Sequence, residues 1–334
     1  MDSNTTKPLD PAGWRFTVAP MLDWTDAWCR AFHRILTRRA RLYSEMVTTG
    51  AVLYGRRDEL LGRIADAGPT ALQLGGSDPE ALARSVEAAE PYGYDEYNLN
   101  CGCPSERVQK GAFGACLMLE APLVAECVRA MRSATNKPVT VKHRIGVDER
   151  SDYGFVRDFV GTVREAGCRV FIVHARAAWL KGLSPKENRE IPPLMRERAF
   201  QLKREFPDLV VVVNGEVSDL ATARELIEGG LDGVMSGRAA YQNPWMLSGV
   251  DEALFGEAPS ILTRREAVSA MTELLRRRAE GNLHAVRAAA RHVNGLMQGL
   301  AGARAWRRAL CDPKLVESAG PELLERAWSI AFGD

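Results

Sequence analysis

The feature that most restricts the fold of this chain is a regular alternation of short apolar runs with helix-like stretches. Eight such runs predict strands, and each is followed by a polar turn. The predicted strands are Phe16–Met21, Leu42–Met46, Ala71–Leu74, Glu96–Asn100, Val139–Lys142, Val170–His174, Leu209–Asn214 and Gly233–Ser236. The helices predicted between or after them include Glu80–Ala89, Leu123–Thr135, Tyr153–Ala166, Arg196–Phe206, Leu220–Glu228 and Pro244–Leu254. This alternation predicts an α/β fold, a (β/α)8 TIM barrel followed by a small C-terminal helical domain.

The length of 334 residues allows one barrel-sized domain and a smaller one. We expect the barrel over residues 14–258, the helical domain over 259–334, and a disordered polar lead-in over 1–13. Seven cysteines without a Cys-x-x-Cys motif argue against a disulfide framework and a metal site. No apolar run approaches the roughly 20 residues of a membrane span. These features predict a soluble, cytoplasmic protein.

Polar or glycine residues end seven of the eight predicted strands. In a barrel of this kind the carboxyl ends of the strands carry the functional site. Strands must leave the barrel toward solvent, but chance would explain only two or three polar ends. The ends read Ala19-Pro-Met-Leu, Glu45-Met, Gln73-Leu-Gly-Gly, Asn100-Cys-Gly-Cys-Pro, Lys142-His-Arg, His174-Ala-Arg, Asn214-Gly-Glu and Gly237-Arg.

Cys103 is the candidate catalytic residue, because it follows the fourth strand on a turn that contains Gly102 and Pro104. A cysteine is more often a buried, inert side chain. Here two asparagines and the glycine-rich turn Gly111-Ala-Phe-Gly are poor core material, so we favour a thiol that meets a ligand. A positioned thiol can act as a general acid.

The last two strand ends, Asn214-Gly and Gly237-Arg, stand where such barrels commonly hold a phosphate group. A cofactor bound there would extend over the barrel mouth, where Lys142, His174 and Gln73 could hydrogen-bond to it. This arrangement suits a flavin, whose reduced form a nearby lysine stabilises. The alternative for Lys142 is a solvated side chain at a strand end, and the alternative for His174 is a histidine of the core.

These residues are part of motifs that resemble the tRNA-dihydrouridine synthases, most closely their A subfamily. The resemblance covers nearly the whole chain. Its motifs are Ala19-Pro-Met-Leu-Asp-Trp-Thr-Asp, Ser44-Glu-Met-Val-Thr-Thr-Gly, Ala71-Leu-Gln-Leu-Gly-Gly-Ser, Asn98-Leu-Asn with Gly102-Cys-Pro-Ser, Gly114-Ala-Cys-Leu-Met, Val141-Lys, His174-Ala-Arg, Ser184-Pro-Lys-Glu-Asn-Arg-Glu-Ile-Pro-Pro, and Gly233-Val-Met with Gly237-Arg.

The resemblance implies an oxidoreductase that uses FMN, with NADPH or NADH as reductant, to reduce the C5=C6 bond of D-loop uridines 20 and 20a. Hydride would reach C6 from the flavin, and Cys103 would protonate C5. The implied cofactor-binding residues are Pro20, Met21, Gln73, Lys142, His174, Asn214, Gly215, Glu216, Gly237 and Arg238. The substrate or tRNA residues are Asn100, Arg144, Arg176, Lys186, Arg189, Arg304, Arg307 and Arg308. We expect a monomer that binds tRNA and no metal or membrane.

Three residues depart from the pattern of that family. Cys101 stands where an aliphatic residue is usual, and it adds a second thiol close to Cys103. His143 replaces a threonine or methionine. Glu216 replaces the second glycine of Asn-Gly-Gly, and a carboxylate near a phosphate is unfavourable unless it points away.

The C-terminal segment is the basic part of the chain. Residues 259–334 contain 12 Lys/Arg and 8 Asp/Glu, although the whole chain has a net charge of only +1. Arg304-Ala-Trp-Arg-Arg combines cations with an aromatic residue, and Arg276–Arg278, Arg287 and Arg291 add positive charge. The long loop at 178–193, with Trp179, is a candidate to close over a target nucleotide. A solvated helix face and a plain surface loop are the alternatives.

Two other functions share parts of this pattern. An FMN barrel that reduces a free pyrimidine or enone would use the same strand ends, but it would need no basic tail and would act without tRNA. A tRNA-folding protein without catalysis would need the tail alone. The presence of Cys103, Lys142 and His174 argues against this second alternative.

Overall fold

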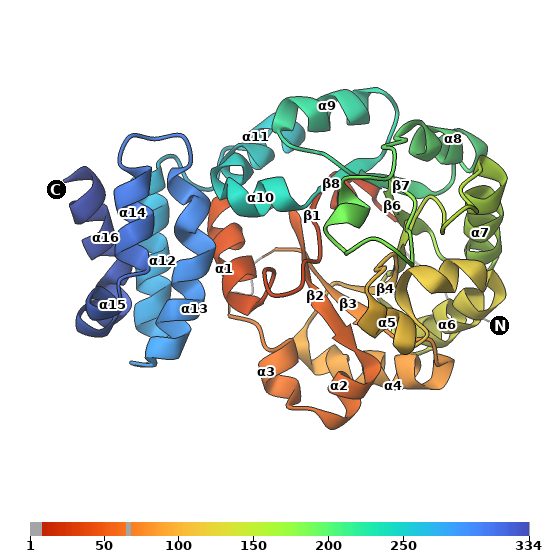
Figure 1. The fold of residues 1–334 in the computed structure, drawn as a ribbon, viewed down its shortest axis with the longest axis horizontal. Helices are drawn as coiled ribbons and strands as arrows, with labels where there is room; N and C mark the ends of the chain where they lie inside the picture. The colour runs from red at the N-terminus through yellow and green to blue at the C-terminus, as the bar shows by residue number, and fades with distance from the viewer. Residues whose placement is uncertain (1–8, 65–67, 334) are drawn as a thin grey trace.

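The computed structural model of the protein describes residues 9–64 and 68–333. Eight parallel strands form a closed barrel in sequence order, and helices surround it (Figure 1). This arrangement confirms the predicted TIM barrel. The strands are β1 (Phe16–Val18), β2 (Arg41–Thr48), β3 (Thr70–Gly75), β4 (Glu96–Cys101), β5 (Val139–Arg144), β6 (Val170–His174), β7 (Val210–Asn214) and β8 (Gly233–Ser236).

All eight predicted strands are present, but β1 ends at Val18 instead of Met21. Pro20 has no N–H group for a strand ladder. The carbonyl of Met21 then accepts the N–H groups of Trp24 at 3.1 Å and Thr25 at 2.9 Å. The chain therefore turns over the barrel mouth directly after β1, and this turn becomes part of the cavity wall.

The core has two layers because alternate residues of each strand point to opposite faces. Ile172 and Val212 belong to the layer inside the barrel, whereas Phe171 and Val211 pack between the barrel and the helices. Glu96 is buried at the amino end of β4, among the inner side chains. Its carboxylate accepts hydrogen bonds from Trp14 Nε1 at 2.7 Å and the Tyr43 hydroxyl at 2.6 Å, and it pairs with Arg41 at 3.2 Å. This network closes the end of the barrel opposite the carboxyl ends of the strands.

Aspartate begins five of the α-helices in the described residues, since its carboxylate accepts a free N–H of the first turn. The predicted helix Pro244–Leu254 is wrong as a single element. It consists of the 3-10 helix η5 (Pro244–Gly249) and the α-helix α11 (Val250–Phe255). Within η5 the Ser248 hydroxyl donates to the Trp245 carbonyl at 2.8 Å, and Gly249 has low helix propensity. The other helices of the barrel region are α1 (Ala27–Leu36), α2 (Thr49–Tyr54), α3 (Arg57–Leu61), α4 (Pro79–Ala89), α5 (Glu106–Lys110), α6 (Ala121–Ser133), α7 (Tyr153–Glu165), α8 (Glu197–Glu205), α9 (Leu220–Glu228) and α10 (Arg238–Gln242).

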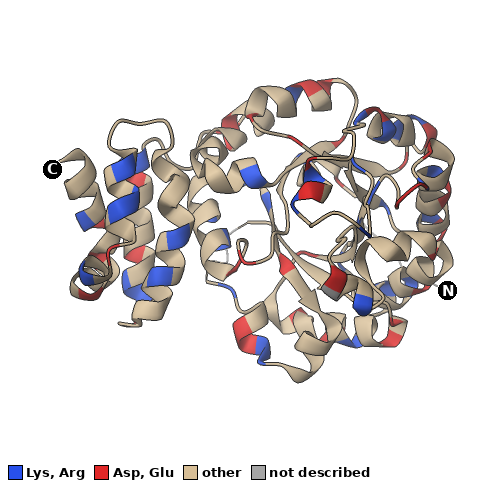
Figure 2. Cartoon of the chain, in the orientation of Figure 1, with Lys and Arg blue, Asp and Glu red and all other residues tan. Residues whose placement is uncertain are grey.

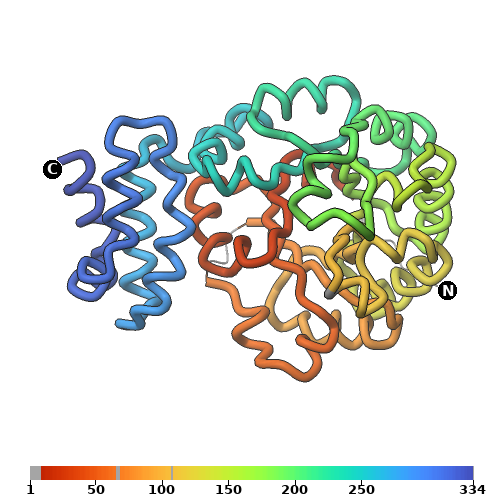
Figure 3. The backbone as a smooth tube through the Cα atoms, viewed as in Figure 1, coloured from red at the N-terminus to blue at the C-terminus, as the bar shows by residue number. Residues whose placement is uncertain are grey.

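The C-terminal helices form a bundle beside the barrel, next to α1 and α10 (Figures 1 and 3). Asp26 joins the two parts. Its carboxylate accepts from Arg291 Nη2 at 2.5 Å and lies 3.0 Å from His292 Nε2. The exact division at residue 259 stays a prediction. The helices of the bundle are α12 (Arg264–Arg278), α13 (Leu283–Val293), α14 (Ala303–Leu310), α15 (Pro313–Ala319) and α16 (Leu323–Phe332).

The amino end of the described chain is tied to the barrel. Pro11–Trp14 form a 3-10 helix, η1, whose Trp14 is buried, so the predicted lead-in ends in ordered structure. Residues 1–8 of that lead-in lie outside the described residues. Within residues 9–64 and 68–333, no helix has the length and apolar character needed to cross a membrane.

Candidate active site

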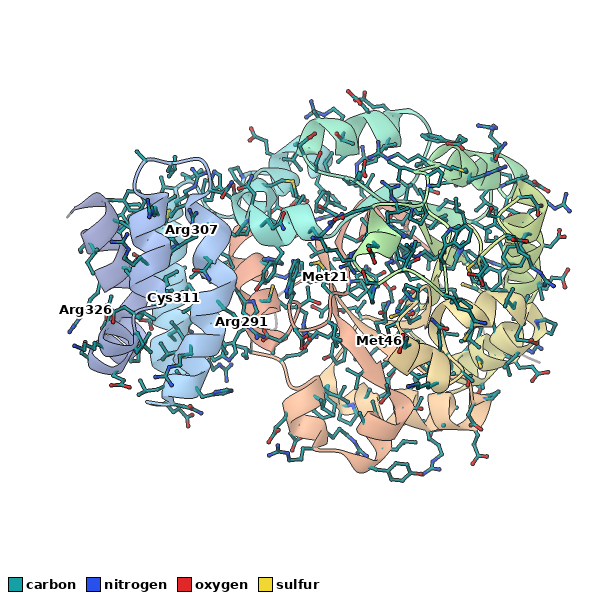
Figure 4. The ribbon with its side chains drawn as sticks, in the orientation of Figure 1. Met21, Met46, Arg291, Arg307, Cys311 and Arg326 are labelled. Carbon is teal, nitrogen blue, oxygen red and sulfur yellow. The ribbon has the colours of Figure 1, made fainter. Side chains whose placement is uncertain are left out.

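The carboxyl ends of the strands open into a cavity of about 660 Å³. Two of its lining residues, Met21 and Met46, are labelled near the middle of the barrel in Figure 4. The cavity brings together all the predicted catalytic and cofactor-binding residues. Its lining includes Cys103, Pro20, Met21, Gln73, Lys142, His174, Asn214, Gly215, Glu216, Gly237 and Arg238, together with the predicted substrate residues Asn100, Arg144, Arg176 and Arg189.

Cys103 is held at the cavity wall by the backbone of its own turn. The side-chain oxygen of Asn100 accepts the N–H groups of Gly102 at 3.1 Å and Cys103 at 3.0 Å. The Cys103 carbonyl accepts the Ala115 N–H at 2.9 Å. Gly114, with φ of 78°, must be glycine, since a Cβ there would lie 2.6 Å from that carbonyl oxygen. The half-buried thiol is thus placed by fixed backbone contacts, and its Sγ lies 3.5 Å from the Ser105 hydroxyl.

A chain of buried amide side chains links the neighbouring strands β3, β4 and β5. Asn100 Nδ2 donates to Gln73 Oε1 at 2.8 Å, and Gln73 Nε2 donates to Asn98 Oδ1 at 2.7 Å. Asn98 Nδ2 in turn donates to the Thr140 hydroxyl at 2.7 Å. The chain fixes which way the Gln73 amide points and leaves one of its two N–H groups for a ligand. The Asn100 side chain lines the cavity and its oxygen holds the cysteine turn, while its predicted place beside a target base stays a prediction.

Lys142 and His174 line the cavity, and neither side chain has a hydrogen bond or ion pair to any described residue. Burial lowers the pKa of Lys142 to about 7, and the charge of Arg144 adds to this effect. Burial also lowers the pKa of His174 well below its usual range, with further effects from Arg144 and Lys142. His174 is therefore neutral near pH 7 and offers one donor and one acceptor nitrogen. Lys142 is poised to gain a proton when an anionic group lies nearby.

The turn after β7 presents backbone donors to the cavity. Arg196 Nη2 donates to the carbonyls of Gly215 at 2.9 Å and Glu216 at 2.6 Å. In a trans peptide the N–H points away from the carbonyl, so the N–H groups of Glu216 and Val217 point away from Arg196. Neither N–H donates to any described residue. Gly215 and Glu216 line the cavity, and free backbone N–H groups beside a glycine can bind phosphate oxygens.

Arg144 lines the cavity and also supports its wall; its contact with a substrate stays a prediction. It is 4% exposed, and its guanidinium donates to the carbonyls of Gly102 at 3.1 Å, Ala177 at 3.2 Å and Asn188 at 2.7 Å. It therefore ties the cysteine turn to the long loop after β6. Asn188 is buried within that loop and accepts the Trp179 N–H at 2.7 Å. Its contacts hold the loop at the edge of the cavity.

The remaining predicted tRNA residues lie outside the cavity. Lys186 is exposed on the loop after β6. Arg304, Arg307 and Arg308 are exposed on α14, and none has an ion pair to a described residue. Arg307 and Arg291 are labelled on the bundle in Figure 4, and Figure 2 shows Lys and Arg gathered on the bundle helices.

One detail of the predicted basic tail is wrong. Trp306 is 0% exposed, and its Nε1 donates to the Val293 carbonyl at 3.2 Å, so it is not available to stack on a base. The helical period turns it inward while its neighbours in sequence face solvent. Several of the other tail arginines are already paired with carboxylates: Arg265 with Glu325, Arg276 with Glu322, Arg277 with Glu273, Arg287 with Glu317 and Arg291 with Asp26.

Two of the three unusual residues lie away from the ligand cavity. Cys101 is buried between the barrel and its helices, because it alternates with the inward-facing Asn100, and burial raises its pKa. The second thiol therefore does not compete with Cys103 at the cavity. His143 is also fully buried and packs against Phe159 and Phe171. Glu216 does line the cavity.

Sequence reasoning missed several cavity residues, including Trp24, Arg30 and Glu45. Glu45 accepts the Asp23 N–H, and burial raises its pKa. The sequence placed Glu45 at the end of the predicted second strand but assigned it no role, and in the structure it lies within β2. Trp24 stacks on Tyr241 of α10 with ring centroids 4.4 Å apart, a contact between distant residues that the sequence does not reveal. Among the described residues, no group of three or more His, Cys, Asp or Glu side chains could hold a metal ion.

The arrangement fits a phosphorylated flavin. Lys142 and His174 line the cavity without a hydrogen-bond partner among the described residues, and the turn at Gly215–Glu216, which also lines it, has free N–H groups. The Arg176 Nε is buried and has no hydrogen-bond partner in the described structure. A group with hydrogen-bonding ring edges and an anionic tail would satisfy these donors.

Comparison with known proteins finds similarity to one family along nearly the whole chain. The family model of dihydrouridine synthase (Dus) matches residues 17–330. A tRNA-dihydrouridine(20/20a) synthase of Yersinia pestis is 52% identical over 326 residues, which is 97% of this chain and 93% of that protein. Proteins of the same name from Shewanella oneidensis and Escherichia coli O6:H1 are each 50% identical, over 97% and 98% of this chain and 95% and 97% of their own lengths.

Solved structures support the fold alone. A 2-naphthoyl-CoA reductase complex has a TM-score of 0.58 at 11% identity, and the alignment covers 75% of this chain and 52% of that one. A histamine dehydrogenase from Rhizobium sp. 4-9 has a TM-score of 0.54 at 12% identity, covering 81% of this chain and 51% of that one. The chain therefore spans about half the length of these two proteins.

Proposed function

Because this chain belongs to the dihydrouridine synthase family, we propose that it reduces the C5=C6 bond of uridines 20 and 20a in the D-loop of tRNA. The family is flavin-dependent, and its reaction is a reduction at a CH–CH bond. The observation that carries the proposal is the shared cavity of Cys103, Lys142 and His174 at the barrel mouth, in a chain about half identical to named synthases.

FMN is the proposed cofactor, and NADPH the proposed reductant. When bound, FMN supplies the hydride for C6 of the uracil ring. Lys142, His174 and the remaining Gln73 N–H would hold the ring system. The turn at Asn214–Glu216 and the Gly237–Arg238 backbone would hold the phosphate. These residues all line the one cavity, so a single ligand can reach both groups.

Cys103 is the proposed proton donor to C5. Its thiol is half-buried at the cavity wall, and Asn100 and Gly114 fix the backbone on either side. A fixed thiol at one face of the ring would give the proton one direction of approach. Arg144 holds the cysteine turn against the loop after β6 and so keeps that geometry.

We propose that the C-terminal bundle binds the tRNA. A uracil stacked inside a folded RNA cannot enter a barrel mouth unless it is turned out of its stack, so the protein must hold the flanking backbone. Arg304, Arg307 and Arg308 are exposed and have no carboxylate partner among the described residues. Their charges are available to phosphates, unlike those of the paired arginines of α12 and α13.

The test is to incubate the purified protein with NADPH and tRNA that lacks dihydrouridine, and to map dihydrouridine at single-nucleotide resolution. Modification at 20 and 20a is expected. Cys103→Ala should keep reduction of the bound flavin but lose most product, whereas Cys311→Ala, at an exposed thiol of the bundle, should behave as wild type. Unmodified tRNA with a normally reduced flavin would favour a small-molecule reductase, and a protein that binds no flavin would favour an RNA-folding role.

A further inference from the structure

Glu216 occupies an unusual place in the wall of the cavity. It follows Asn214-Gly215 in the turn after β7, with φ of 52°, in the left-handed region that favours glycine. Gly215 before it also has positive φ, at 132°. A glutamate therefore stands at a backbone position suited to glycine, and it places a negative charge in the cavity wall, on the turn whose Glu216 and Val217 N–H groups donate to no described residue.

The Glu216 carboxylate is paired with Arg176. The two side chains differ in exposure: that of Arg176 is 7% exposed and that of Glu216 is 54% exposed. Arg176 Nη1 donates to the Pro192 carbonyl, and Nη2 donates to Glu216. The buried Nε has no hydrogen-bond partner in the described structure. Arg176 is therefore a fixed cation that lacks one partner, whereas the carboxylate that neutralises it is on the solvent side and free to move.

A second pair stands on the same rim. Arg238 Nη1 lies 2.5 Å from Glu190 Oε1, and the hydrogen bond from Arg238 lowers the pKa of Glu190. Arg238, which was predicted at the phosphate end, and Arg176, which was predicted to contact the substrate, are thus each paired with a carboxylate. An incoming phosphate would meet two arginines whose charges are balanced by two carboxylates, and one of these, Glu216, belongs to the turn that carries the free backbone N–H groups.

We propose that Glu216 is an internal competitor for the phosphate of the cofactor, which weakens the binding of a phosphorylated flavin relative to the same ring without phosphate. The inference rests on the proposed flavin function and concerns this residue of this chain. Because the carboxylate is more than half exposed, solvent screens its repulsion and the side chain can swing out. The effect is therefore a moderate change in affinity and not a block.

The experiment measures the dissociation constants of FMN and riboflavin for the flavin-free protein by fluorescence quenching. The ratio of the riboflavin constant to the FMN constant isolates the contribution of the phosphate. Glu216→Gln keeps the side-chain shape and removes the charge, and should raise this ratio about 3- to 10-fold with riboflavin binding unchanged. Glu225→Gln is the matched control, since Glu225 is an exposed carboxylate on the neighbouring helix α9 and does not line the cavity. It should leave the ratio as in wild type.

The outcomes separate this inference from the proposed function. An unchanged or lowered ratio in Glu216→Gln overturns the competition, and a lowered ratio would mean that Glu216 instead positions Arg176 for the phosphate. Equal affinity for FMN and riboflavin in both the wild type and Glu216→Gln would overturn the inference while leaving the flavin site intact. A wild-type protein that binds neither compound would overturn both. Riboflavin binding by each variant also reports that the barrel mouth is correctly folded.

Discussion

Replacing Lys142 with methionine should stabilise the flavin-free protein at neutral pH while it weakens flavin binding. Lys142 lies at the end of β5 without an anionic partner among the described residues, and burial lowers its pKa from 10.5 to about 7. Methionine has a similar length and no charge, so it fills the site without the cost of a buried ammonium group. Stabilisation at the expense of ligand binding is the behaviour expected of a residue kept for function.

The magnitude follows from the two pKa values. Between about pH 7 and pH 10.5 the unfolded chain keeps the Lys142 proton and the folded protein loses it, so this group makes stability rise with pH across that interval. The corresponding cost to the folded state is about 4 kcal/mol at pH 7 and about 2 kcal/mol at pH 9. The advantage of Lys142→Met over wild type should therefore shrink by about 2 kcal/mol between these two pH values.

The assay is urea unfolding of the flavin-free proteins, followed by circular dichroism at pH 7, 8 and 9. The difference between variant and wild type cancels the titration of the other groups. Lys181→Met, at an exposed lysine of the loop after β6, should follow the wild-type pH profile and controls for the loss of a lysine. A Lys142→Met advantage that stays constant from pH 7 to pH 9 would refute the reasoning, because it would mean that Lys142 does not titrate in this range.

Three further predictions concern the barrel end, the contact between barrel and bundle, and the tRNA surface. Glu96→Ala leaves the buried Arg41 without its carboxylate and should lower the free energy of unfolding by about 3–5 kcal/mol, measured by urea unfolding. Asp26→Asn keeps an N-cap for α1 but removes a charge whose pKa is lowered to about 2, and should cost about 2 kcal/mol above pH 4, a loss that fades as pH falls toward 2. Reversing Arg307 and Arg308 to glutamate should weaken tRNA binding and reduce the slope of log Kd against log salt by about 2.

Each of these predictions has a result that would contradict it. A loss below about 1 kcal/mol for Glu96→Ala would mean that the network at the barrel end is not a coupled one. An Asp26→Asn cost that persists at pH 2 would assign the effect to packing and not to charge. For the tRNA surface, Arg204→Glu on α8 is the control, since it changes an exposed arginine in the last turn of a barrel helix. An equal loss of tRNA affinity in that control would mean that the bundle is not the tRNA-binding surface.

The sequence supported the barrel because its signals are local and repeated. Each strand is a short apolar run between turn residues, and each of five helices begins at an aspartate that the chain itself supplies. The candidate site followed from the fold, since parallel strands deliver their carboxyl ends to one face of a barrel. Cys103, Lys142 and His174 could therefore be placed together although they are far apart along the chain.

The hydrogen bonds and ion pairs between side chains could not be predicted from the sequence in the same way. Periodicity was available to turn Trp306 inward, but its basic neighbours suggested a stacking surface. The amide chain through Gln73, Asn98 and Asn100 depends on the register of β3 against β4, which no local pattern specifies. The pairing of Arg144 with the backbone of two loops likewise needs those loops to be placed first.

The sequence by itself determined the fold class and the set of residues that reach the barrel mouth, because secondary structure and strand direction depend on local periodicity and on turn residues. Only the tertiary structure decided which charges are free. Arg176 is compensated by Glu216 and Arg291 by Asp26, whereas Arg307 has no partner among the described residues. These differences arise from contacts between segments distant in the chain, and burial together with such contacts sets the charge and pKa that each group brings to the site.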